Sequence, residues 1–320
     1  MGAFQRFARP VILAAARQEG LRRTAERLPA TRAVVHRFVP GESVADVMNS
    51  VDQLRDSRRL VSTDYLGEDV TDAEAANATV EAYLHLLEAL SARDEAPAAV
   101  RPLEVSLKLS ALGQALPRDG EKIALENARA ICERAQRAGV WVTVDAEDHT
   151  TTDSTLSIVR ELRADFDWVG TVLQAYLKRS RADCAEFAAS GARIRLCKGA
   201  YDEPASVAFR DRDDVTASYL QCLRILMAGS GYPMVASHDP EIIDAVPAMV
   251  RENGRSADDF EYQMLYGIRD AEQRRLADED SHVRVYVPFG TQWYGYFVRR
   301  LAERPANLTF FLRALAERRR

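Results

Sequence analysis

Short apolar runs alternate along the chain with longer amphipathic stretches. The runs are rich in Val, Ile and Leu, and a helical pattern of roughly 10 to 20 residues follows each of them. Runs of this kind are typical of parallel strands that are buried on both faces. We therefore predict eight βα units, with strands at residues 59–66, 103–109, 140–146, 170–176, 193–199, 233–238, 260–266 and 283–288.

Eight such units in succession favour an α/β fold of the (β/α)8 TIM-barrel type over an open sheet. No GxGxxG fingerprint follows the first run, which disfavours a Rossmann fold. Acidic residues at 71–74 and 211–214 indicate helix starts. We expect three parts: an N-terminal helical flanking segment (1–58), with an apolar stretch at 34–39, a catalytic barrel (59–307) and a C-terminal helix (308–320).

Polar residues gather at the predicted carboxyl ends of the strands, where barrel enzymes place their catalytic groups. Lys108 is unusual because a lysine in an apolar strand is costly to bury unless it is paired or used. It either pairs with a carboxylate of a neighbouring strand, such as Asp145, or faces a substrate, and the two interpretations overlap. The strand ends carry Asp64, Glu68, Lys108, Ser110, Asp145, Glu147, Asp148, Gln174, Arg195, Lys198, His238, Gln263 and Tyr286.

Two adjacent arginines, Arg299 and Arg300, lie in a helical stretch after the eighth predicted strand. Neighbouring helix residues point about 100° apart, so both side chains reach one small anion only if the helix lies across the site. Arginine's forked donors suit a carboxylate. A solvated helix face is the alternative, in which Glu303 pairs with Arg299 one turn away.

Charge and cysteine content narrow the class of protein. A net charge of −5 and a pI near 5.7 argue against nucleic acid as a partner. Cys132, Cys184, Cys197 and Cys222 form no CxxC pair, so we expect reduced core thiols, which suit the cytoplasm. We see no signal peptide and no membrane-spanning run. The C-terminal helix has an apolar face and terminal arginines, so it either packs on the barrel or docks peripherally on the inner face of the cell membrane.

Eight segments, one at each strand end, carry a resemblance. They are Ser106-Leu-Lys-Leu-Ser110, Asp145-Ala-Glu147, Gln174-Ala-Tyr176, Arg195-Leu-Cys-Lys-Gly-Ala-Tyr201, Ser237-His-Asp239, Glu261-Tyr-Gln-Met-Leu-Tyr-Gly267, Arg284-Val-Tyr-Val-Pro-Phe-Gly290 and Tyr296-Phe-Val-Arg-Arg-Leu-Ala-Glu303. Together they resemble the flavin-dependent proline dehydrogenase family, over roughly residues 60–310. The length suits a monofunctional member, without the second, aldehyde-oxidising domain of bifunctional relatives.

The resemblance implies a distorted barrel whose last helix lies over the mouth, where non-covalently bound FAD oxidises L-proline to Δ1-pyrroline-5-carboxylate. It also implies a membrane quinone as electron acceptor and a separate pyrroline-5-carboxylate dehydrogenase that receives the product. The implied substrate residues are Lys108, Arg299 and Arg300 for the carboxylate, and Asp145, Tyr286, Tyr296 and Leu265 for the ring. The implied cofactor residues are Arg195 near flavin N5, with Gln174, Lys198, Gly199, Ala200, Tyr201, His238 and Glu303.

Three other interpretations remain open on the residues alone. Asp145, Glu147, His149 and His238 could form the metal site of a barrel hydrolase, although no compact multi-histidine pattern supports it. Lys108 or Lys198 could form a Schiff base in an aldolase. The barrel could also bind a ligand without catalysis.

Overall fold

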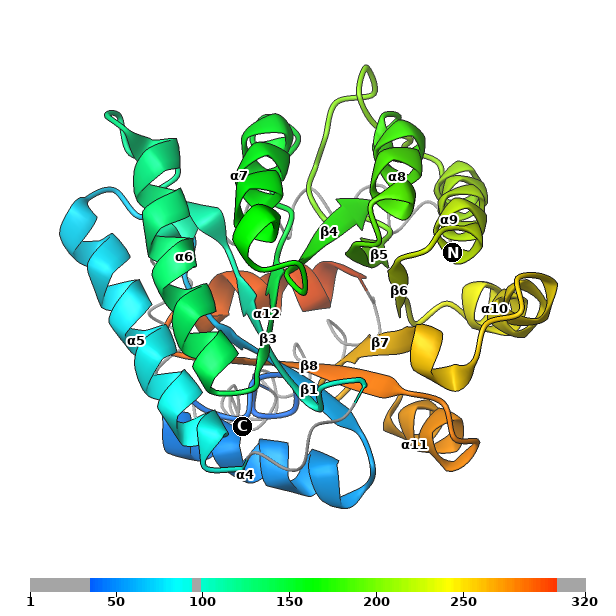
Figure 1. Ribbon diagram of the computed structural model, residues 1–320, viewed down its shortest axis with the longest axis horizontal. Coiled ribbons are helices and arrows are strands. Elements are labelled where there is room, and N and C mark those ends of the chain that lie inside the picture. The colour runs from blue at the N-terminus through cyan, green and yellow to red at the C-terminus, as the bar shows by residue number, and fades with distance from the viewer. Residues whose placement is uncertain (1–34, 94–98, 304–320) are drawn as a thin grey trace, which may run out of the picture.

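Eight parallel strands form a closed barrel in the computed structural model, which describes residues 35–93 and 99–303 (Figure 1). For residues 299–303 it describes the backbone alone. Each strand pairs with the next in sequence, and β8 returns to β1, so the predicted barrel is confirmed. The strands are β1 (Leu60–Tyr65), β2 (Leu103–Leu107), β3 (Trp141–Val144), β4 (Gly170–Gln174), β5 (Arg193–Cys197), β6 (Tyr232–Ala236), β7 (Glu261–Leu265) and β8 (Val283–Phe289).

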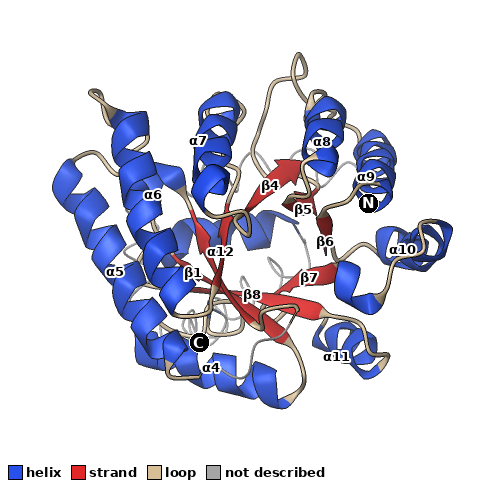
Figure 2. Ribbon diagram, viewed as in Figure 1, coloured by secondary structure: helices blue, strands red, loops and turns tan. Residues whose placement is uncertain are grey.

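Helices connect the strands and surround the barrel (Figure 2). Two predicted helix starts are confirmed: Asp72 accepts a hydrogen bond from the Ala75 amide at 2.8 Å, and Asp211 accepts one from Asp213 at 2.9 Å. The helices are α4 (Val44–Asp56), α5 (Ala73–Ser91), α6 (Gly120–Arg137), α7 (Thr152–Asp165), α8 (Ser180–Ala189), α9 (Arg212–Ala228), α10 (Pro240–Glu252), α11 (Asp270–Asp278) and α12 (Trp293–Glu303), with 3-10 turns η1 (Leu109–Leu112) and η2 (Ala257–Asp259).

The last helix, α12, leaves the outer ring and crosses the open end of the barrel (Figure 1). On the outer wall α4 takes its place, packing against both β1 and β8. The predicted displacement of the last helix is therefore confirmed. Its apolar side chains bury themselves in a mouth cluster, made of Val35, Phe38, Val39, Leu66, Ile268, Trp293, Tyr296 and Phe297.

The strands are buried on both faces, and charged and polar side chains gather on the inward face, beside a few apolar ones such as Trp141 and Met234. In β2, Val105 and Leu107 belong to the large core between barrel and helices, whereas Glu104 and Ser106 contact side chains of other strands inside the barrel. The predicted burial of the strands on both faces is confirmed, but charged groups stand inside this barrel, where branched apolar residues are usual. The interior holds Asp64, Glu104, Arg193, Arg195, Glu261, Gln263 and Arg284.

All four cysteines are free thiols, and three are buried while Cys197 is half-buried, in agreement with the sequence. Among the described helices, none combines the length and apolar character needed to span a membrane. The helix predicted at 308–320 and residues 1–34 of the flanking segment lie outside the described residues. The division into three parts stays a prediction.

Candidate active site

Lys108 lies directly after β2 and is only 8% exposed. Its Nζ donates to Asp64 Oδ2 at 2.6 Å and lies 3.6 Å from Asp145 Oδ2. The predicted pairing with a carboxylate of a neighbouring strand is confirmed, and Asp64 of β1 is the closer partner. Burial alone would lower the pKa of Lys108, but Asp64, Asp145 and Glu68 raise it above its usual range. The lysine therefore stays charged.

Tyr286 of β8 joins the same two carboxylates. Its Oη lies 2.6 Å from Asp64 Oδ2 and 2.9 Å from Asp145 Oδ2. One hydroxyl proton can be donated to only one of them at a time. Burial raises the pKa of Tyr286 well above its usual value. Burial also raises the pKa of Asp145, in spite of Arg195 and Lys108 nearby. The group can therefore accommodate an additional proton at Asp145.

Arg195 projects from β5 into the barrel and is 5% exposed. A guanidinium has five N–H groups, and each of those in Arg195 has an acceptor from this protein. The side chain is therefore fixed from several strands at once, and its charge is buried next to the predicted substrate group. The acceptors are Gln263 Oε1 for Nε at 2.5 Å, Ser106 Oγ at 2.9 Å and Asp145 Oδ1 at 2.6 Å for Nη1, and Ser62 Oγ at 3.4 Å and Glu104 Oε1 at 2.7 Å for Nη2.

Two of the predicted cofactor residues, Gln174 and Gly199, have distinctive local environments. Gln174 ends β4 and is 3% exposed, and its Oε1 has no hydrogen-bond partner among the described residues. Gly199 adopts a φ of +107° against the ring of Tyr176, where a Cβ would lie only 2.2 Å from Cδ1. Any side chain at 199 would collide with that ring, so the loop after β5 requires glycine.

The remaining predicted cofactor residues in the described part lie in the loops after β5 and β6. Lys198 Nζ donates to Asp239 Oδ2 at 2.7 Å and to Thr216 Oγ1 at 2.8 Å, so the protein already holds it. His238 Nε2 accepts the backbone N–H of Leu265 at 2.9 Å, which places a predicted cofactor residue beside a predicted substrate residue. Ala200 and Tyr201, the other predicted cofactor residues after β5, are half-buried.

Helix α12 carries the other predicted residues. Tyr296 is 6% exposed and belongs to the mouth cluster, against which Leu265 and Tyr286 also pack. Arg299, Arg300 and Glu303 lie on the last turns of α12, which crosses the mouth, but their side chains are outside the described residues. Their contacts with substrate and cofactor stay predictions.

The structure gives no support to the metal-site interpretation. The four candidate ligands have separate partners: Asp145 contacts Arg195, Glu147 contacts Ser110, His149 contacts Glu203, and His238 contacts Leu265. Within residues 35–93 and 99–303, no three His, Cys, Asp or Glu side chains are arranged to hold a metal ion.

The aldolase interpretation is disfavoured for Lys108, because a Schiff-base lysine needs a lowered pKa and that of Lys108 is raised. For Lys198 it stays an open alternative.

Sequence reasoning missed the charged groups inside the barrel. Glu104 is 1% exposed and contacts both Arg193 and Arg195, and Arg284 at 0% exposure is paired with Glu261. Alternation is the signal that marks them as one face, because polar residues occupy every second position of the strands concerned, although it does not show that this face is the inner one. The alternating sets are Ser62 and Asp64, Glu104, Ser106 and Lys108, Arg193 and Arg195, Glu261 and Gln263, and Arg284 and Tyr286.

Glu147 makes protein stability depend on pH near the site. Its carboxylate accepts the Ser110 amide at 3.1 Å, and burial raises its pKa to about 7 from a usual 4.5. A carboxyl whose pKa is higher in the folded state favours folding while it is protonated, so this contribution is lost as pH rises from 4.5 to about 7. We expect Glu147→Gln to reduce the fall in unfolding free energy over that range by about 3 kcal/mol.

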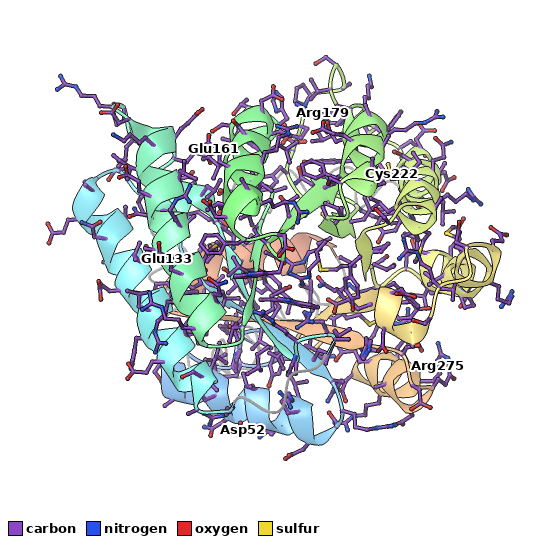
Figure 3. All side chains as sticks on the ribbon, in the orientation of Figure 1. Asp52, Glu133, Glu161, Arg179, Cys222 and Arg275 are labelled. Atoms are coloured by element: carbon purple, nitrogen blue, oxygen red, sulfur yellow. The ribbon has the colours of Figure 1, made fainter. Side chains whose placement is uncertain are left out.

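Urea unfolding on each side of that pH range measures the difference. Glu161→Gln, on the exposed face of α7, is the matched control and is expected to leave the pH dependence as it is in the unmodified chain (Figure 3). An equal pH dependence in the Glu147 variant and the unmodified chain would show that the buried carboxyl does not titrate in this range.

The fold and the site together define a (β/α)8-barrel protein with a buried ionic group at the carboxyl ends of its strands, covered by its last helix. The family model for proline dehydrogenase matches residues 47–313. The chain is 40% identical over 284 residues to a proline dehydrogenase of Deinococcus radiodurans, covering 88% of this chain and 90% of that protein. It is 38% identical over 288 residues to proline dehydrogenase 1 of Bacillus subtilis, covering 90% and 92%. The chain belongs to the proline dehydrogenase family.

Longer proteins share the same barrel. The crystal structure of proline utilization A from Bdellovibrio bacteriovorus, inactivated by N-propargylglycine, superposes with a TM-score of 0.77 and 25% identity over 85% of this chain. The chain spans 32% of that protein, and 24% of the bifunctional protein PutA of Escherichia coli, to which it is 26% identical over 88% of its own length.

Proposed function

We propose that this chain oxidises L-proline to Δ1-pyrroline-5-carboxylate. One observation carries the proposal: in a member of this family, side chains of four neighbouring strand segments, Lys108, Asp64, Asp145 and Tyr286, meet in one group, and Asp145 contacts the buried cation Arg195. Such a group offers positive charge for a carboxylate and an acceptor for the proton of an amine, and proline carries both groups close together.

Substrate binding divides between the strand ends and the covering helix. We assign the carboxylate of proline to Lys108, Arg299 and Arg300, since α12 carries the arginines across the mouth. The ring would lie against side chains of β7, β8 and α12, whose apolar parts exclude water from the reacting carbon. These side chains, together with Asp145, are Leu265, Tyr286 and Tyr296.

The described residues fit a flavin. The buried Oε1 of Gln174 suits the ring N–H of an isoalloxazine, and the charge of Arg195 suits a cofactor that becomes anionic when reduced. Bound FAD would supply the acceptor for the hydride that leaves the substrate carbon. We propose that it is held without a covalent bond by Gln174, Arg195, Lys198, Gly199, Ala200, Tyr201, His238 and Glu303.

Asp145 is our candidate for the proton of the substrate nitrogen. The C=N bond of the product forms when hydride leaves the ring carbon and the nitrogen gives up a proton. A carboxylate with a raised pKa is a better base than an ordinary aspartate, and burial raises the pKa of Asp145. Lys108 and Arg195 beside it keep the ionised form accessible.

We further propose that a membrane quinone takes the electrons and that the product passes to a separate pyrroline-5-carboxylate dehydrogenase. The four free thiols support a cytoplasmic location, and the apolar pattern of residues 308–320 supports peripheral contact with the inner face of the cell membrane.

Visible absorption of the purified chain tests the proposal. We expect the spectrum of oxidised flavin, loss of that spectrum on adding L-proline without oxygen, and its return on adding a soluble quinone. D-Proline is the control substrate and is expected to leave the spectrum unchanged. Heat denaturation should release free FAD, as expected for a non-covalent cofactor. A colourless chain that takes up no added FAD would overturn the proposal.

A further inference from the structure

Glu104 lies inside the barrel, below the proposed site, and bridges two arginines of β5. Its Oε1 accepts from Arg195 Nη2 at 2.7 Å, and its Oε2 contacts Arg193 Nη2 and accepts from Thr143 Oγ1 at 2.9 Å. The side chain is 1% exposed. Glu104 pairs in register with Trp141, the first residue of β3, whereas Asp145 follows the last residue of that strand. The two carboxylates therefore hold Arg195 from opposite ends of the barrel.

Glu104 is ionised inside the barrel. Burial alone would raise the pKa of its carboxyl, but Arg193, Arg284 and Arg195 hold the pKa far below its usual value. Burial alone would likewise lower the pKa of Arg195, and Asp145 and Glu104 raise it. The ion pair is thus a fixed feature of the barrel over the whole physiological pH range.

All five N–H groups of Arg195 have protein acceptors, so its partners fix the position of this guanidinium, and the carboxylates among them offset its positive charge. Of the two carboxylates among them, Asp145 belongs to the proposed site, and Glu104 contacts neither Lys108 nor Tyr286. Removing Glu104 takes away a negative charge at 2.7 Å from Arg195 while leaving the proposed substrate contacts in place.

We propose that Glu104 is a positioning residue that anchors Arg195 and limits the positive charge it presents to the cofactor at the barrel mouth. The proposal rests on the proposed function, because the group that senses this charge is bound FAD. Two-electron reduction gives flavin a negative charge, which a nearby cation favours and a nearby carboxylate opposes. Glu104 therefore holds the reduction potential below the value that an unpaired Arg195 would produce.

The midpoint potential of the bound FAD, titrated with dithionite against a reference dye, measures this effect directly. We expect Glu104→Gln to raise the equilibrium constant for flavin reduction at least tenfold, which is about 30 mV for a two-electron couple. Glu261→Gln is the matched control: it removes an equally buried carboxylate that pairs with Arg284 and is hydrogen-bonded to Gln263 rather than to Arg195. We expect this control variant to change the equilibrium constant for flavin reduction by less than about threefold.

A second pair of variants guards against loss of folding. Glu104→Gln combined with Arg193→Gln removes one negative and one positive buried charge together. We expect this double variant also to raise the potential, by at least threefold in the equilibrium constant for flavin reduction relative to the unmodified chain. Glu104→Asp keeps the carboxylate, and the potential should stay within threefold of the unmodified value. If Glu104→Gln, or the double variant where the single one does not fold, moves the potential no more than Glu261→Gln does, the inference is wrong.

Failure of the proposed function looks different. In that case the unmodified chain binds no flavin or its flavin is not reduced by proline, whatever residue stands at 104. Failure of the inference alone leaves an unmodified chain whose flavin proline reduces, with a potential that does not respond to residue 104.

Discussion

Replacing Lys108 with methionine is expected to lower kcat/KM for proline by about 100-fold, close to 3 kcal/mol, mainly through a higher KM. The side chain is buried and its Nζ lies 2.6 Å from Asp64. Solvent therefore cannot compensate for the loss of its positive charge. Methionine fills a similar space but leaves the carboxylate of proline beside Asp64 and Asp145 without this cation. Steady-state kinetics with proline and a quinone analogue measure the effect.

The exposed lysine of α6 provides the control. Lys122 has a side chain that is 73% exposed and lies 3.9 Å from Glu126, so Lys122→Met should leave both constants unchanged. The flavin content of each variant shows that it is folded. An unchanged KM in a folded Lys108→Met variant would show that the lysine does not bind the substrate and only pairs with Asp64.

Replacing Arg284 with methionine is expected to lower the free energy of unfolding by about 3 to 5 kcal/mol. Arg284 is fully buried and binds both carboxylate oxygens of Glu261, at 2.7 and 2.9 Å. Without it the carboxylate has lost its main counter-charge in the barrel interior. Chemical denaturation measures the loss, and Arg284→Met combined with Glu261→Met should recover most of it, because no unpaired charge is left.

An arginine on the surface separates the effect of burial from that of pairing. Arg275 projects from the outer face of α11 and also contacts two carboxylates, Glu272 and Glu279, with its side chain 47% exposed (Figure 3). Solvent screens these contacts, so Arg275→Met should cost less than about 1 kcal/mol. Equal losses for the two arginines would contradict the view that burial makes the Arg284 pair sensitive.

The barrel itself was accessible from the sequence. Eight short segments rich in Val, Ile and Leu, each followed by a helical pattern, predicted its strands, and the interpretation of Arg299 and Arg300 as ligands of one anion predicted the helix that lies across the mouth as α12. The predicted partner of Lys108 was found in part: Asp145 is near, but Asp64 is nearer. Which carboxylate lies closer to Lys108 depends on strand register and on the tilt of the strands in the barrel. Both are set by pairing between segments that are distant in sequence.

The charged barrel interior was harder to foresee. Glu104 and Arg193 are 89 residues apart in sequence, and either side chain alone looks like a surface residue. Their burial is tolerable only because each provides the other's counter-charge. A sequence pattern reports the polarity of a position, but not which face of a closed sheet looks inward.

The position of α4 affects how the chain is made. This helix precedes the first strand, yet it packs against β8, the last strand to be synthesised, as well as against β1. On the ribosome, Val47, Val51 and Leu54 must therefore wait for nearly the whole barrel before their burial is complete. A nascent or truncated chain that ends before β8 exposes this apolar face, as a binding site for chaperones and a mark for proteolysis.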